Sequence, residues 1–258
     1  SEILPPARCR SPFAQELERT MQRFLVNHEL VDDDKVVPDY LPLALMIDRR
    51  EFGVGLTTHG VKDSVAYQYD HLLHSISGDF HKLRPSTYHC DRALNRERLE
   101  TAQELLGDLL PVRVENHSLN WYMTLTLKAV ALLGLENLML EMAEEPEEVE
   151  RLMTFLTQDV ERFLDWQEAE NLLTANSGNH YVGSGSFGFT RELDTEAPRL
   201  TTRSLWGNMN SQESSCISPA MYRELVYPYY ERLAGRFGHI YYGCCEPVHA
   251  IWKDCLEN

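Results

Sequence analysis

The chain has 258 residues, and 43% of them are hydrophobic, which is enough to fill the core of one large domain or two small ones. The formal net charge is −16, which argues against a nucleic acid or an anionic membrane as the main partner. No apolar stretch approaches the roughly 20 residues of a membrane span. The first residues lack the basic and apolar regions of a signal peptide, and the six cysteines are irregularly spaced. We therefore expect a cytoplasmic protein with free thiols.

The N-terminal segment predicts a helix over residues 12–30, because its apolar side chains recur with helical spacing. The acidic run Asp32–Asp34 breaks this pattern, and we interpret it as a solvated turn, with metal binding as the alternative. Residues 36–46 are apolar but contain two prolines, which predicts an irregular first strand. We accordingly expect an N-terminal helical extension, residues 1–35, and one main domain, residues 36–258.

The main domain alternates between predicted helices and short predicted strands. An amphipathic helix is expected over residues 93–110, followed by a strand at 111–114. A second helix should begin at Pro146, because proline at the first helical position and acids in the first turn both suit a helix start. A third helix should begin after the capping Ser218 and be kinked by Pro228.

This third helix leads into a short apolar strand, residues 240–242, which stops at Gly243. The order helix, glycine, strand and polar loop occurs more than once in the chain. It predicts βα units and an α/β fold with a mostly parallel sheet. In such folds the active site lies at the C-terminal ends of the strands.

Metal-ligating side chains follow that last strand directly. They are Cys244, Cys245 and Glu246, with His249 three residues further on. Thiolates, imidazoles and carboxylates are ligands of zinc, so this segment predicts a zinc site. Glu246 is alternatively an acid–base group. Because adjacent residues of an extended chain point to opposite sides, we expect only one of the two cysteines to face the site.

Three further side chains complete the predicted catalytic set with Glu246. His117 follows the predicted strand 111–114, and Asn208 and Gln212 lie in a polar loop that can hydrogen-bond a substrate. A solvated loop is the alternative for the last two. Residues 183–188 match G-x-G-x-x-G, but no convincing helix follows, so we interpret them as an active-site loop rather than a dinucleotide site.

Three segments carry a resemblance to a known superfamily. They are residues 121–165, residues 217–230 and the strand that runs into Gly243–Pro247. They resemble the uroporphyrinogen decarboxylase-like superfamily, which includes cobalamin-dependent methyltransferases acting on corrinoid proteins and thiols. The resemblance implies a TIM-type (β/α) barrel with its site at the C-terminal strand ends. It also implies that roughly two or three βα units of the barrel are missing after residue 258, so a truncated barrel is expected.

The branch of the superfamily depends on motifs that are only partly present. The arginine-rich motif of the decarboxylases is not matched by Asp48-Arg49-Arg50. The His-x-Cys motif of the zinc methyltransferases aligns with Tyr242 and Cys244, so that Glu246 or His249 would replace its histidine.

We therefore expect a zinc-dependent methyltransferase that moves a methyl group between a corrinoid, free or on a partner protein, and a thiol. A tetrapyrrole decarboxylase that uses Arg113 and Arg203 is the second hypothesis. A non-catalytic remnant that binds a tetrapyrrole or a partner chain is the third. The expected partners are a small-molecule or corrinoid-protein substrate and a second copy of the chain.

Overall fold

The computed structural model describes residues 3–31, 35–53, 55–60 and 67–257. The predicted turn at Asp32–Asp34 lies outside these residues. The chain forms two compact units, each built from two segments. The first unit contains Ser1–Met46 and Asp91–Glu115, and the second contains Ile47–Cys90 and Asn116–Asn258. Residues 36–46 and 91–115, which the sequence pattern places in the main domain, thus fold in one unit with the N-terminal helix.

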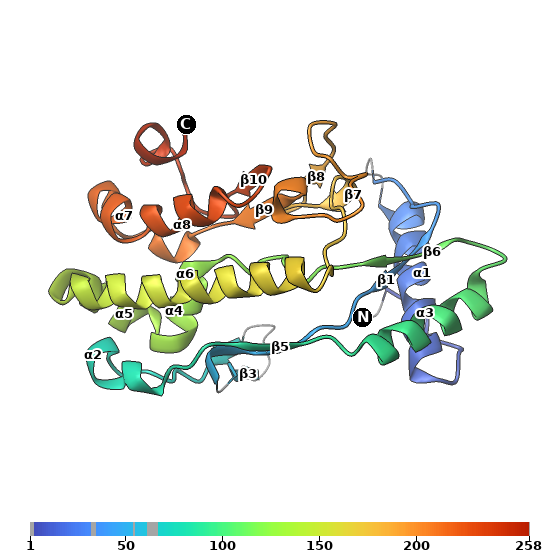
Figure 1. Cartoon of the computed structure of the whole chain (residues 1–258), viewed down its shortest axis with the longest axis horizontal. Coiled ribbons are helices and arrows are strands. Elements are labelled where there is room, and N and C mark those ends of the chain that lie inside the picture. The colour runs from blue at the N-terminus through green and yellow to red at the C-terminus, as the bar shows by residue number, and fades with distance from the viewer. Residues whose placement is uncertain (1–2, 32–34, 54, 61–66, 258) are drawn as a thin grey trace. The chain divides into compact units, whose positions relative to one another are not determined.

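The first unit consists of two helices and one pair of strands. The helices are α1 (Pro12–Leu30) and α3 (Arg92–Leu106), and the strands β1 (Leu41–Ala44) and β6 (Val112–Glu115) pair in parallel (Figure 1). Ser11 caps α1 and Asp91 caps α3, because each side chain accepts a hydrogen bond from a backbone N–H three residues on. The predicted helix over residues 12–30 is confirmed at both ends.

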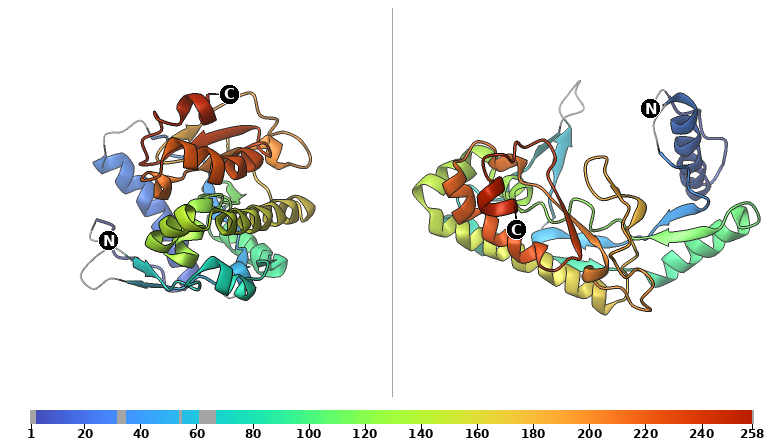
Figure 2. Two further views of the ribbon diagram at one scale, coloured as in Figure 1. Left: turned by 90° about the vertical axis from the view of Figure 1, so that its left-hand side faces the viewer. Right: turned by 90° about the horizontal axis from the view of Figure 1, so that it is seen from above.

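The second unit contains six of the described α-helices, and α6 is the longest of them. Together they are α2 (Ile76–Asp79), α4 (Leu125–Leu133), α5 (Leu135–Glu144), α6 (Pro146–Ala169), α7 (Pro219–Leu225) and α8 (Tyr227–Ala234). Helix α6 contacts α4, α5, α7 and α8, and Figures 1 and 2 show α7 and α8 on one side of it. The predicted start at Pro146 is confirmed, because proline and two glutamates occupy the first turn.

The predicted kink after Ser218 is a complete break between α7 and α8. The backbone leaves the helical region at Val226, with φ −123° and ψ −56°, and Pro228 lies in the first turn of α8. Proline has no N–H to donate and its ring crowds the preceding turn, so it is compatible with a helix start and not with a helix interior. The chain therefore changes direction between α7 and α8, and α8 leads to the next strand.

The described strands form pairs. Strands β9 (Trp206–Met209) and β10 (His239–Tyr242) are parallel and are joined through α7 and α8, as the βα pattern predicts. Three further pairs are antiparallel: β2 (Asp48–Arg50) with β5 (Thr87–His89), β3 (Thr58–Gly60) with β4 (Tyr67–Tyr69), and β7 (Gly178–Tyr181) with β8 (Phe187–Gly188). None of these sheets is a closed barrel in the described part of the chain, and a TIM-type barrel stays a prediction.

The core of the second unit is built around α6. Phe163 is fully buried, with its ring centroid 4.5 Å from that of Tyr122 and 4.7 Å from that of Tyr88. Such tilted aromatic pairs add to the free energy gained by burying the rings. Among the described helices, none is both long enough and apolar enough to cross a lipid bilayer.

A buried ion pair lies beside this aromatic cluster. The Nζ atom of Lys128 in α4 is 2.8 Å from Oε1 of Glu51 and 3.9 Å from the ring centroid of Tyr122. Lys128 is only 7% exposed, and burial lowers the pKa of its ammonium group, while Glu51 acts in the opposite direction. Arg49, Glu51 and Lys128 line a pocket of about 230 Å³. The pair is therefore held in a largely dehydrated environment.

Candidate functional site

The parallel strands β9 and β10 bring two polar loops to the same end of the sheet. Asn208 lies opposite Tyr241 in the register, and both loops start one or two residues later. The N–H of Gly243 still donates to the carbonyl of Met209, over 2.9 Å. Gly243 itself has φ +123°, a conformation that glycine adopts readily and other residues rarely do. It ends the strand and turns the chain into the segment that carries the cysteines.

Cys244 and Cys245 are both exposed, and their Sγ atoms are 3.4 Å apart. The two sulfurs thus lie close together instead of on opposite sides of an extended chain, because the backbone turns at Gly243. That only one of the two cysteines faces the site stays a prediction. Ser184, in the loop between β7 and β8, donates a hydrogen bond to Cys244 Sγ over 3.1 Å. The pKa of Cys245 is raised, mainly by its hydrogen bond to Cys244 and by the charge of that neighbour. The thiol of Cys245 therefore holds its proton more tightly than a free cysteine does.

Glu246 joins the two loops. Its Oε1 atom accepts a hydrogen bond from the N–H of Ser211, after β9, and its Oε2 atom accepts one from the N–H of Cys244, after β10; both distances are 2.9 Å. Both carboxylate oxygens are thus used to hold backbone. This geometry gives Glu246 a positioning role, and its predicted acid–base role stays a prediction.

The predicted zinc ligands are not gathered into one coordination shell. His249 is exposed, and the oxygens of Glu246 are committed to backbone N–H groups. In the described part of the chain no three His, Cys, Asp or Glu side chains come close enough to hold a metal ion. Because zinc sites in proteins use at least three protein ligands, this donor set does not fit one. Zinc binding stays a prediction, and we route no chemical step through a metal.

The side chain of Asn208, one of the predicted site residues, is buried and unpaired in the described part of the chain. It is 7% exposed, and neither its amide oxygen nor its amide nitrogen has a hydrogen-bond partner among the described residues. Buried amides are normally satisfied, so an unpaired one indicates a place for a bound molecule. A Cβ atom at Gly183 would lie 2.1 Å from the ring of the neighbouring Tyr241, so only glycine lets this loop reach the ring. The loop over residues 183–188 thus covers the same strand face, as an active-site loop would.

The two other predicted catalytic side chains face solvent. Gln212 is exposed in a short 3₁₀ turn, Gln212–Ser214, next to Ser211. His117 is exposed at the turn that follows β6. Their catalytic roles stay predictions.

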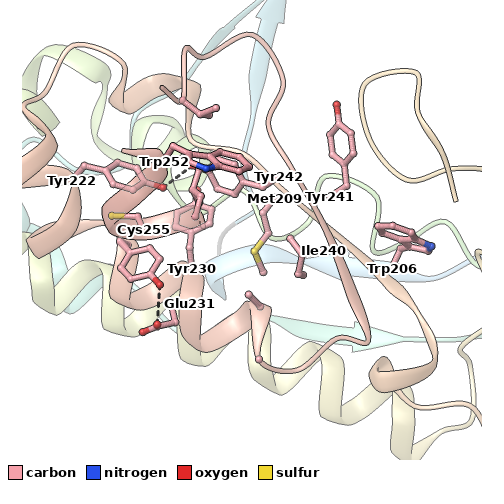
Figure 3. Close-up of a pocket in the computed structure, with 15 residues that line it drawn as sticks. Trp206, Met209, Tyr222, Tyr230, Glu231, Ile240, Tyr241, Tyr242, Trp252 and Cys255 are labelled. Atoms are coloured by element: carbon pink, nitrogen blue, oxygen red, sulfur yellow. Dashed lines mark hydrogen bonds between the residues drawn. The ribbon is translucent and has the colours of Figure 1, made fainter. Parts of the chain in front are cut away.

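A pocket with a volume of about 640 Å³ lies beside the same strand end (Figure 3). It is bordered by α8, β10 and the C-terminal turn Trp252–Leu256. The sequence did not predict it, because its lining comes from segments that are separate in the chain. Seven of its fifteen described lining residues are aromatic, among them Tyr222, Tyr227, Tyr230, Tyr242 and Trp252.

Hydroxyl groups connect this pocket to the loop after β9. The Oη atom of Tyr242 is 2.6 Å from that of Tyr222 and 2.5 Å from Ser211 Oγ. Tyr230 Oη donates to the carbonyl oxygen of Asn210 over 2.7 Å. The pocket wall and the loop carrying Ser211 are therefore parts of one hydrogen-bonded assembly.

The buried tyrosines predict a marked loss of stability at alkaline pH. Burial raises the pKa of Tyr88 and of Tyr227 to about 12, and it also raises the pKa of Tyr222, Tyr230 and Tyr242. Because the folded state holds these protons more tightly than the unfolded state, the free energy of unfolding should fall between about pH 10 and pH 12. The absorbance of tyrosinate and the circular dichroism should change together in one transition. This transition should lie at a higher pH than the one at which the tyrosines of the urea-unfolded chain lose their protons. Titration of most tyrosines near pH 10 with the fold intact would contradict this.

Comparisons with known proteins leave the family open. No family model matches the chain, and no curated protein matches it. Among solved structures, the chain is similar to a methyltransferase from Methanosarcina mazei, with 10% sequence identity and a TM-score of 0.41 over 88% of this chain and 56% of that one. The chain thus spans little more than half the length of that methyltransferase. A likeness at this level does not establish a shared fold, and the superfamily resemblance stays a prediction.

Proposed function

We propose that this chain is a methyltransferase that directs a methyl group to a thiol, with Cys244 as the sulfur nucleophile. The observation that carries the proposal is the position of Cys244: exposed, at the C-terminal end of a parallel strand, and accepting a hydrogen bond from Ser184. The superfamily resemblance agrees with this chemistry. The Sγ atom of Cys245 lies 3.4 Å from the same sulfur, within hydrogen-bond distance.

Methyl transfer in this arrangement is a displacement at carbon. The thiolate sulfur of Cys244 attacks the methyl carbon, an S–C bond forms, and the bond from that carbon to the leaving group breaks with its electron pair going to the leaving group. Ser184 donates a hydrogen bond to this sulfur, and the Cys245 thiol lies within hydrogen-bond distance of it. The unpaired amide of Asn208 offers one donor group and one acceptor to a polar part of the bound molecule.

A corrinoid enters this proposal as an external partner, free or bound to another protein, that would carry the methyl group. The 640 Å³ pocket has the size that accommodates a drug-sized molecule and is small for a corrinoid macrocycle. The described residues therefore do not fit a resident corrinoid, and we derive no step through one.

The decarboxylase alternative lacks support from its two arginines. Arg113 is exposed and lies over the ring of Tyr40, 4.4 Å from its centroid, in the first unit. Arg203 is exposed and donates to the carbonyl oxygen of Phe237 over 3.4 Å. Both side chains are thus engaged with protein groups instead of lining the aromatic pocket.

The proposal is tested by following an isotopically labelled methyl group onto the protein. Wild-type protein, incubated separately with methyl-labelled methylcobalamin and methyl-labelled choline, should gain label at Cys244, located by peptide mass spectrometry. Cys244→Ser should abolish labelling, and Cys216→Ser, which removes another exposed thiol of the second unit, should leave it unchanged. No labelling of the wild type by either donor, or equal labelling of Cys244→Ser, would refute the proposal.

Elemental analysis of the same protein, purified without chelator, separates this mechanism from the zinc-dependent one. We expect less than stoichiometric zinc, because the described residues do not supply three ligands. Stoichiometric zinc that disappears in a Cys244→Ser, Cys245→Ser double variant would restore zinc as the activator of the thiol.

A further inference from the structure

We propose that the aromatic pocket beside β10 binds a methylated ammonium cation, such as a quaternary amine. Two properties of its lining carry the inference. Seven of the fifteen described lining residues are tyrosine or tryptophan, and the one charged side chain among these fifteen is the carboxylate of Glu231. Aromatic rings attract cations through the negative potential of their faces, and quaternary ammonium groups are recognised by cages of such rings.

Four of the five tyrosines that line the pocket have a hydroxyl group that is already hydrogen-bonded inside the protein. Tyr222 and Tyr242 bond to each other (Figure 3), Tyr230 bonds to the carbonyl of Asn210, and Tyr227 donates to Glu231 Oε1 over 2.8 Å. These four hydroxyls are therefore engaged with protein groups. A ligand rich in hydroxyl groups would lose its hydrogen bonds to water here, whereas an ammonium ion covered by methyl groups has none to lose.

The arrangement of the rings suits a compact cation. The rings of Tyr230 and Tyr242 meet edge to face, with centroids 6.2 Å apart and an interplanar angle of 74°. Two walls at such an angle form a corner, and Trp252 and Tyr222 border the same cavity. Since cation–π attraction acts within about 6 Å of a ring centroid, a small cation in this corner interacts with more than one ring.

The local charges favour a cation as well. Arg232, next to Glu231 in the chain, forms a bidentate pair with Glu161, with distances of 2.6 and 2.7 Å. Arg223 pairs with Asp254 over 3.1 Å. These two arginines are thus paired with other acids, and the formal charge of −16 raises the local concentration of cations.

The binding site stands on this geometry alone, and the role of the bound cation as a methyl donor rests on the proposed function. When the bound cation donates a methyl group, the reaction balances without a further reagent. The thiolate of Cys244 takes one methyl group, the C–N bond breaks, and a neutral tertiary amine leaves with the electron pair.

Calorimetric titration compares choline with 3,3-dimethylbutan-1-ol, which has the same shape without the charge. Choline should bind saturably and about tenfold or more tightly than the neutral compound, since two or more rings and one carboxylate contribute to the difference. Glu231→Gln and Trp252→Leu should each weaken choline binding severalfold; both side chains are exposed, so the fold should persist. Phe189→Leu, a change at an exposed aromatic residue outside the pocket lining, should have no effect.

Each result decides one of the two proposals. Equal affinity for choline and its neutral analogue, an unchanged affinity in both pocket variants, or no saturable binding would overturn the ammonium site. Methyl transfer from methylcobalamin to Cys244 without choline binding would keep the function and reject this site. Choline binding with no methyl transfer from any donor would keep the site and reject the function.

Discussion

Replacing Glu51 with glutamine should lower the free energy of unfolding by about 3–5 kcal/mol. Lys128 would then remain in the core, 7% exposed, without its anionic partner at 2.8 Å. The rings of Tyr122 and Phe52, whose centroids are 3.9 and 5.7 Å from Nζ, compensate only in part, because cation–π attraction is worth about 1–2 kcal/mol. Urea unfolding followed by circular dichroism measures the change, provided that its denaturant slope stays constant.

A double variant distinguishes loss of the pair from loss of packing. In Glu51→Gln, Lys128→Met the buried charge is gone together with its partner, so most of the lost stability should return. Asp254→Asn removes the exposed partner of Arg223 and should cost less than about 1 kcal/mol. If Glu51→Gln costs no more than Asp254→Asn, the buried pair does not stabilise the fold.

Replacing Phe163 with alanine should cost about 3–5 kcal/mol, and this is the second large effect that we expect. The ring is fully buried in α6 and contacts Tyr88, Tyr122 and Trp166. Its removal loses the transfer free energy of the ring and leaves a cavity that rigid aromatic neighbours cannot close. Thermal and urea unfolding of the purified variant measure the cost.

Two further variants serve as comparisons for this result. Phe163→Leu keeps part of the buried volume and should cost clearly less than the alanine variant. Phe189→Ala removes a ring that is 64% exposed and should change stability by less than about 0.5 kcal/mol. Similar costs for Phe163→Ala and Phe189→Ala would show that the cluster around α6 does not dominate the stability of the second unit.

Helix ends were predictable because the residues that determine them are neighbours in the sequence. Ser11 and Pro12 start α1, and Pro146 with the glutamates that follow it starts α6. The break before α8 also follows from one residue, Pro228, although the chain separates fully instead of bending. The short antiparallel pairs were not predicted, because strands of two to four residues carry too little periodicity to be recognised.

The candidate site was predictable in position and only partly in its contacts. The end of β10 was predicted from Gly243, and the exposed cysteines come directly after it in the sequence. The partner of Glu246 is Ser211, 35 positions away, and the ring that excludes a side chain at Gly183 belongs to Tyr241. Such contacts are created by the pairing of β9 with β10 and by the loop that covers it. No local pattern encodes them, and the aromatic pocket was missed for the same reason.

The bonds of Glu246 have a consequence for motion. One carboxylate holds the N–H groups of Ser211 and Cys244, and the hydroxyl of Ser211 bonds to Tyr242 in the pocket wall. Because one carboxylate holds both loops, they cannot move apart without breaking a hydrogen bond to Glu246. Loss of this carboxylate would release the loop after β9 and the loop after β10 at once.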